Sequence, residues 1–163
     1  MSGGSIIVIA FLAFVAITIF KGVRIVPQGY KWIVQRLGKY HTTLNPGLNF
    51  VIPYVDEVAY KVTTKDIVLD IPSQEVITRD NAVLLMNAVA YINLTTPEKA
   101  VYGIENYSWA IQNLVQTSLR SIVGEMDLDD ALSSRDHIKA RLKSSISDDI
   151  SDWGITLKTV EIQ

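Results

Sequence analysis

The chain begins with a long apolar run. Residues 6–20 read IIVIAFLAFVAITIF, in which Thr18 is the only polar side chain. As a helix this run covers roughly 22 Å, and extension to Val26 brings it to about 30 Å, the thickness of a bilayer's hydrocarbon core. No face of the run is polar, which excludes an amphipathic helix lying on a membrane surface. We therefore predict a transmembrane anchor over residues 1–26, whose lipid-facing side chains include Ile6, Ile7, Phe11, Leu12, Phe14, Ile17 and Phe20.

A cleaved secretory signal is the alternative interpretation, because an apolar core of this length also fits one. Signal peptides place basic residues before the core, whereas residues 2–5 read SGGS and the nearest bases, Lys21 and Arg24, follow it. That order favours a retained anchor. The Ile, Val, Leu and Phe residues of the run contribute roughly −0.3 to −0.6 kcal/mol each, so insertion is favourable by several kcal/mol.

Residues 27–94 show the alternation of β-strands separated by turns. Apolar and polar residues alternate after Tyr30, Gly38 interrupts that strand, and Asn45-Pro46-Gly47 is a turn signal. The longest predicted strand spans residues 82–94. One of its faces is continuously apolar and consists of Leu84, Met86, Ala88, Ala90, Ile92 and Leu94.

Residues 96–153 change to helical spacing. Helix starts are predicted at four residues that favour the N-cap position, namely Thr96, Ser108, Asp127 and Ser134. The last of these helices repeats an apolar residue every fourth position, at Ile138, Leu142, Ile146 and Ile150. Gly154 supplies a left-handed end, and residues 155–162 return as a strand. We predict an α+β fold: a single transmembrane helix, a β-rich subdomain over 27–65 and an α/β subdomain over 66–163.

Charge is distributed unevenly along the 163 residues. The totals of 15 basic and 17 acidic side chains are nearly balanced, yet every acid lies at Asp56 or beyond it. The segment between the apolar run and Asp56 is purely basic and interleaved with aromatic residues, which after an anchor indicates contact with anionic headgroups more than nucleic-acid binding. The predicted headgroup contacts are Lys21, Arg24, Tyr30, Lys31, Trp32, Arg36 and Lys39.

The same bases predict the topology. Because they all follow the apolar run, positive-inside counting places the main domain in the cytoplasm and the N-terminus outside. Residues 49–55 read NFVIPYV, and two interpretations of this segment remain open. It is either an ordinary buried edge strand or a loop that dips into the leaflet through Phe50, Ile52 and Tyr54.

Residues that could support catalysis are few. The sequence contains no cysteine, and we find no nucleophile elbow, phosphate-binding loop, HExxH or dinucleotide fingerprint. Its two histidines, His41 and His137, lie far apart in the chain. A membrane-tethered hydrolase that uses His137 with Asp136 is the weakest hypothesis. We expect no enzyme activity, no metal site and no cofactor.

Five phrases of the sequence resemble, in order and with natural spacing, the stomatin, prohibitin, flotillin and HflK/C (SPFH) family, nearest to the bacterial QmcA and paraslipin-like stomatins. They are VPQGYKWIVQRLGKY (26–40), LNPGLNFVIPYVDEV (44–58), LDIPSQEVITRDNA (69–82), IVGEMDLDDALSSRD (122–136) and WGITLKTVEI (153–162). The departures are small, with Leu37 at a position where the family often has Phe.

The resemblance implies two subdomains, SPFH1 and SPFH2 (band 7), after the anchor, in a single-pass protein of the bacterial inner membrane. It also implies a non-enzymatic scaffold whose subunits assemble into a homo-oligomeric ring or cage, organise a membrane microdomain and modulate an FtsH-type AAA protease or an NfeD-like membrane protein. Family members continue into a long helix, so we expect a longer native chain. The charged candidates for subunit edges are Arg79, Asp80, Arg120, Asp127, Arg135 and Asp136.

One alternative keeps this fold and changes the topology. In it, the main domain lies on the outer face of the membrane and acts there as a regulator.

Overall fold

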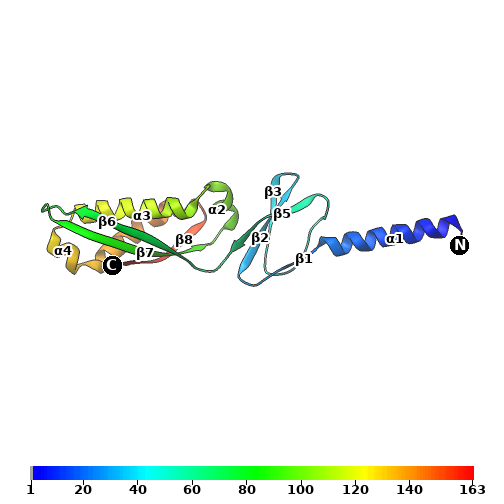
Figure 1. Ribbon diagram of the computed structural model, residues 1–163, viewed down its shortest axis with the longest axis horizontal. Helices are drawn as coiled ribbons and strands as arrows, with labels where there is room; N and C mark the ends of the chain where they lie inside the picture. The colour runs from blue at the N-terminus through cyan, green and yellow to red at the C-terminus, as the bar shows by residue number, and fades with distance from the viewer. Residues whose placement is uncertain (1) are drawn as a thin grey trace. The chain divides into compact units, whose positions relative to one another are not determined.

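The structure, a computed structural model, describes residues 2–163, and Figure 1 labels its helices and strands. The chain divides into two units, Met1–Thr63 and Thr64–Gln163. This boundary lies two residues before the one predicted from the sequence. The fold is α+β, with one apolar helix followed by strands, then helices, then a closing strand.

Helix α1 (Gly3–Gly22) carries the apolar run. Its 20 residues are about 30 Å long, which makes the helix long and apolar enough to cross a membrane. Apolar side chains are exposed around its whole circumference. The one polar group within the run is satisfied locally, since the Thr18 hydroxyl donates a hydrogen bond of 2.8 Å to the Phe14 carbonyl.

The helix ends four residues before the predicted end of the anchor, because Val23–Val26 form strand β1. Gly22 marks the change, and the Val51 N–H donates a hydrogen bond of 2.8 Å to its carbonyl. A Cβ at Gly22 would lie 2.6 Å from the Val51 carbonyl oxygen and 2.7 Å from the Phe50 ring. Only glycine permits so close an approach of the two segments.

The first unit contains two antiparallel sheets. Strand β1 pairs with β4 (Gly47–Phe50) to form a two-stranded ribbon. The second sheet has the order β3-β2-β5 and consists of β2 (Tyr30–Arg36), β3 (Lys39–Leu44) and β5 (Asp56–Thr63). Its small core consists of Val26, Val34, Leu44 and Val51, with Trp32 and Val58 packed against it.

The second unit is a three-stranded antiparallel sheet with helices. The strands β6 (Ile67–Ile77), β7 (Val83–Leu94) and β8 (Ile155–Ile162) have the order β6-β7-β8. The predicted apolar face of β7 is confirmed, since every second residue from Met86 to Leu94 is buried. On the opposite face Val83 and Leu85 are exposed.

Four helices connect β7 to β8, and Figure 1 shows α3 running alongside the sheet. They are α2 (Pro97–Gly103), α3 (Tyr107–Gly124), α4 (Leu128–Ser133) and α5 (Arg135–Ser151). Helix α3 packs on β6 and helix α5 packs on β8. The four residues predicted at every fourth position of α5 are all fully buried, so the predicted buried face of this helix is confirmed.

The predicted helix starts are correct for three of the four helices. Thr96, Asp127 and Ser134 occupy the N-cap positions of α2, α4 and α5, although none of their side chains makes the capping hydrogen bond. The prediction of Ser108 is wrong. Asn106 is the N-cap of α3, and its side-chain oxygen accepts a hydrogen bond of 3.1 Å from the Trp109 N–H. Asn and Ser have nearly equal N-cap preference, so local pattern does not separate them.

Candidate membrane-facing site

The predicted anchor side chains all lie exposed along α1. Their exposed fractions range from 53% at Ile17 to 80% at Phe20. In water, so much contiguous apolar surface would oppose solubility, and patches of this size mark a membrane or protein contact. Since these side chains surround the helix, the surface they offer suits lipid on every side.

A second apolar surface comes directly after α1 in the chain. It lies on the ribbon formed by β1 and β4. Val23 is paired with Phe50, and Ile25 with Leu48, so the alternation of the strands brings these four side chains to one face, which we call the ribbon face. Ile25, Leu48 and Phe50 are 70%, 76% and 61% exposed. Leu48 was not predicted to face the membrane, and Ile25 was predicted only as part of the anchor. Their alternation with Arg24 and Asn49 was the available signal.

Residues 49–50 end strand β4, and the rest of the predicted segment 49–55 is a tight turn. Phe50, Ile52 and Tyr54 are exposed, whereas Val51 between them is buried in the core of the first unit. The turn closes through the Asp56 N–H, which donates a hydrogen bond of 2.8 Å to the Ile52 carbonyl. The exposure of Phe50, Ile52 and Tyr54 excludes the buried edge strand, and their insertion into the leaflet stays a prediction.

Arg36 forms an ion pair within the fold, although the sequence suggested a headgroup contact. Its Nε and Nη2 atoms donate hydrogen bonds of 2.6 Å and 3.0 Å to the two carboxylate oxygens of Asp56. The Asp56 side chain is 3% exposed, whereas that of Arg36 is 37% exposed. A bidentate pair of this kind is both strong and directional, so it joins the end of β2 to the start of β5.

The pair also alters the acidity of Asp56. The hydrogen bond from Arg36 is the largest influence, and a second hydrogen bond from the Ile52 N–H adds to it. Together they lower the pKa of Asp56 to about 2, although burial acts in the opposite direction. The carboxylate is therefore charged at any physiological pH, and it holds the 52–56 turn through the Ile52 N–H.

The other predicted basic contacts are more available. Lys21, Arg24 and Lys39 are exposed, and Lys31 is half-buried. Trp32 is also half-buried, and the ammonium of Lys61 lies 4.5 Å from its ring centroid. Lys61 was not predicted as a headgroup contact, because it lies beyond the basic segment. It reaches Trp32 only because β2 and β5 align these two residues.

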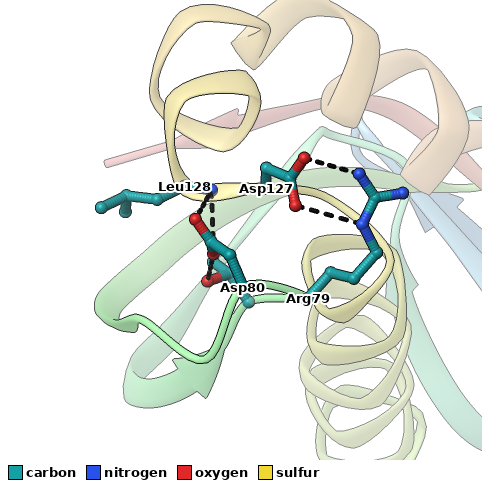
Figure 2. A network of polar contacts seen from close by, with 5 residues as sticks. Arg79, Asp80, Asp127 and Leu128 are labelled. Atoms are coloured by element: carbon teal, nitrogen blue, oxygen red, sulfur yellow. Dashed lines mark hydrogen bonds and ion pairs between the residues drawn. The ribbon is translucent and has the colours of Figure 1, made fainter.

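Three of the predicted subunit-edge residues meet one another inside the second unit. Figure 2 shows Arg79, which follows β6, in a bidentate pair with Asp127 at the start of α4, at 2.5 Å and 3.1 Å. Asp80 accepts hydrogen bonds from the Leu128 N–H and the Thr78 hydroxyl. The Thr78 bond is the largest cause of the lowered pKa of Asp80. These charges fasten the β6–β7 connection to α4.

The remaining edge residues differ in how they are engaged. Arg120 donates a hydrogen bond of 2.8 Å to the side-chain oxygen of Gln74, which is itself nearly buried. Arg135 and Asp136 are exposed in the first turn of α5, and no ion pair within residues 2–163 uses either of them. His137, the base of the hydrolase hypothesis, is exposed beside them.

Comparison with known proteins identifies the family. The SPFH domain / Band 7 family matches residues 24–163. The chain belongs to this family. An uncharacterized protein of Methanocaldococcus jannaschii is 41% identical over 145 residues, which are 89% of this chain and 72% of that protein.

Two further relatives are longer. An uncharacterized protein of Mycobacterium tuberculosis is 35% identical over 164 residues, covering 98% of this chain and 43% of its own length. Human stomatin-like protein 2, mitochondrial, is 37% identical over 138 residues, covering 85% of this chain and 39% of its own length. The chain thus spans less than half the length of these two relatives. The resemblance seen in the five sequence phrases is confirmed, and the apolar helix of an SPFH chain fits a membrane protein.

Proposed function

We propose that this protein is a non-enzymatic membrane scaffold, anchored by α1, that assembles into a ring or cage and organises the bilayer patch it encloses. The observation that carries the proposal is the continuity of two apolar surfaces. Helix α1 exposes apolar side chains on all sides and passes at Gly22 directly into the ribbon face. Membership of the SPFH family supports the same function.

Assembly would strengthen the membrane attachment, because each subunit contributes one anchor. Anchoring also raises the effective concentration of neighbouring subunits, so that their lateral docking becomes effectively intramolecular. Repeated contacts of a heterologous kind close into a ring when the rotation between neighbours permits. Such a ring would confine partner proteins, and we propose an FtsH-type AAA protease or an NfeD-like membrane protein as the partner it modulates.

Arg135 and Asp136 are the best placed of the candidate edge residues. Arg79, Asp80 and Asp127 use their charges within the second unit, so subunit contacts through them would compete with existing bonds. Arg135 and Asp136 are exposed at the start of α5, where each can pair with an oppositely charged side chain on a different surface of a neighbouring subunit.

For the location we propose the bacterial inner membrane, with the N-terminus outside and the main domain in the cytoplasm. The support is the position of the bases. Lys21 and Arg24 lie at the C-terminal end of α1 and just after it, whereas the described residues before the apolar run carry no charged side chain.

The mass of the full-length gene product, extracted in a mild nonionic detergent, tests the assembly. Multi-angle light scattering should report a particle of many subunits. Arg135→Glu should reduce that mass, and the matched charge reversal Lys99→Glu, at an exposed residue of α2, should leave it unchanged. A protein that is monomeric at every concentration would contradict the scaffold.

A reporter fused after Gln163 tests the topology separately. Activity of a cytoplasm-specific reporter supports the proposed orientation. Activity only outside the cytoplasm would instead make the protein an SPFH-type regulator on the outer face, with the same fold and anchor.

A further inference from the structure

The first unit contains an open pocket beside β1, and Val23 and Ile25 of the ribbon face also border it. It has a volume of about 790 Å³, within the range of small-molecule sites, and its lining includes Arg24, Trp32, Val51, Tyr54, Val58 and Lys61. We propose that this pocket binds the phosphate diester of a phospholipid headgroup. The inference rests on the proposed membrane anchoring, and it adds a specific lipid site to it.

Strand geometry directs two cations to this pocket. Arg24 lies two residues before Val26, so both side chains point to the same side of β1, and Val26 is buried in the core against which Trp32 packs. Lys61 is directly opposite Trp32 in the pairing of β2 with β5, and its ammonium lies 4.5 Å from the ring centroid. The pocket is thus lined by a cation from each of two different strands.

The acidic groups in the lining cancel these two charges only in part. Asp56 is neutralised by its bidentate pair with Arg36. Glu57 also lines the pocket, and its single negative charge offsets only one of the two cations. The pocket therefore keeps a net positive charge, and Lys and Arg both form charge-assisted hydrogen bonds with phosphate oxygens.

The position of the pocket close to the end of α1 favours a lipid headgroup over free phosphate as its ligand. Arg24 is the second residue after the end of α1, so its backbone lies within roughly 7 Å of the helix terminus. A spanning helix ends at the headgroup layer, and the pocket then opens at the same depth. Trp32 and Tyr54 in the lining are the residue types that favour this layer, where one end of the ring meets lipid and the other meets water.

The alternative is a Lys61 that merely covers Trp32 and contributes, like any exposed base, to diffuse attraction by anionic lipids. The two explanations differ in which lysine matters. Lys39 is exposed in β3 and is absent from the lining. If the attraction is diffuse, removing the charge of Lys39 should weaken lipid binding as much as removing that of Lys61. A pocket depends on Lys61 and Arg24 and is indifferent to Lys39.

The experiment uses the intact chain in maltoside micelles with Trp109→Phe and Trp153→Phe, which leaves Trp32 as the only fluorophore of its kind. Short-chain dihexanoyl phosphatidylglycerol is titrated, and inorganic phosphate is titrated in a parallel arm. We expect a saturable change in Trp32 fluorescence with the lipid and none with phosphate. Lys61→Gln and Arg24→Gln should each weaken the apparent affinity by about tenfold, whereas Lys39→Gln should not change it.

Lys61→Arg separates charge from packing, since it keeps a cation over Trp32 and should retain the binding that Lys61→Gln loses. Two results would overturn the inference: unchanged affinity in both Gln variants, or equal saturation by inorganic phosphate. Alkaline carbonate extraction of the parent chain and the same variants from membranes separates a failure of the pocket proposal from a failure of the proposed membrane anchoring. If the parent chain is washed off, the proposed function fails; if it stays and lipid binding ignores Lys61, only the pocket fails.

Discussion

Asp56→Asn tests the ion pair that joins β2 to β5, because Asn keeps the shape of the side chain but removes its charge and replaces one of its two acceptor oxygens with a donor. The pKa of Asp56 is lowered from 3.8 to about 2 in the folded chain. One unit of pKa corresponds to about 1.4 kcal/mol, so the charged form stabilises the first unit by about 2 kcal/mol. This value applies to a side chain that is 3% exposed, where solvent screening is weak.

Hydrogen exchange measured by mass spectrometry can localise the loss. At pH 7, amides of β2 and β5 in Asp56→Asn should exchange about 30-fold faster than in the parent chain, the factor that corresponds to about 2 kcal/mol. Amides of β7 and α5, in the second unit, provide an internal reference and should not change. Glu57→Gln removes a neighbouring exposed carboxylate and should have little effect.

The pH dependence has a defined sign. Because the folded pKa of Asp56 is the lower one, its contribution is fully present above about pH 4 and is lost as the pH falls toward 2. After correction for intrinsic exchange rates, the parent chain should lose protection of β2 and β5 in this window, and Asp56→Asn should lack that component. Less than a threefold effect at pH 7, or an equal effect of Glu57→Gln, would refute the reasoning.

Three further substitutions in the second unit should lower the free energy of unfolding, and the loss should be larger where the site is more buried. Urea midpoints of the chain in maltoside micelles measure it. Ile146→Ala empties a fully buried position of α5 and should cost about 2–5 kcal/mol. Gly154→Ala should cost about 1–3 kcal/mol, because Gly154 has φ +68° and a Cβ there would lie 2.5 Å from the Thr96 carbonyl oxygen. Arg79→Ala breaks a pair whose side chains are 64% and 40% exposed and should cost at most about 1 kcal/mol. A larger loss for Arg79→Ala than for Ile146→Ala would contradict this ranking.

Elements with a strong period were predictable from the sequence. The fourfold spacing of Ile138, Leu142, Ile146 and Ile150 and the alternation of β7 report burial directly. The structure agrees at each of these positions except Leu84, which is half-buried near the start of β7. Such patterns are local, because neighbouring side chains of one helix or strand face a common core. The left-handed conformation of Gly154 after α5 was predictable for another local reason, since glycine adopts a positive φ without steric cost.

Features that depend on strand register were not predictable. Arg36 reads as one base among several, and only its position opposite Asp56, 20 residues later, gives it a partner. Lys61 meets Trp32 for the same reason, so no local pattern singles it out. The end of α1 likewise depends on the approach of Val51 to Gly22, since residues 21–26 alone were compatible with an extension of the helix to Val26.

The direct junction at Gly22 makes the first unit responsive to the thickness of its membrane. The hydrogen bond from Val51 joins the last turn of α1 to the segment after the ribbon, and β1 begins at the residue directly after the helix. In a bilayer thinner than about 30 Å the helix relieves mismatch by tilting. A tilted helix would carry the ribbon with it and raise one edge of the ribbon face out of the lipid. We therefore expect the depth of Ile25 and Leu48, read by a solvatochromic label at either position, to follow the acyl-chain length of the surrounding lipid.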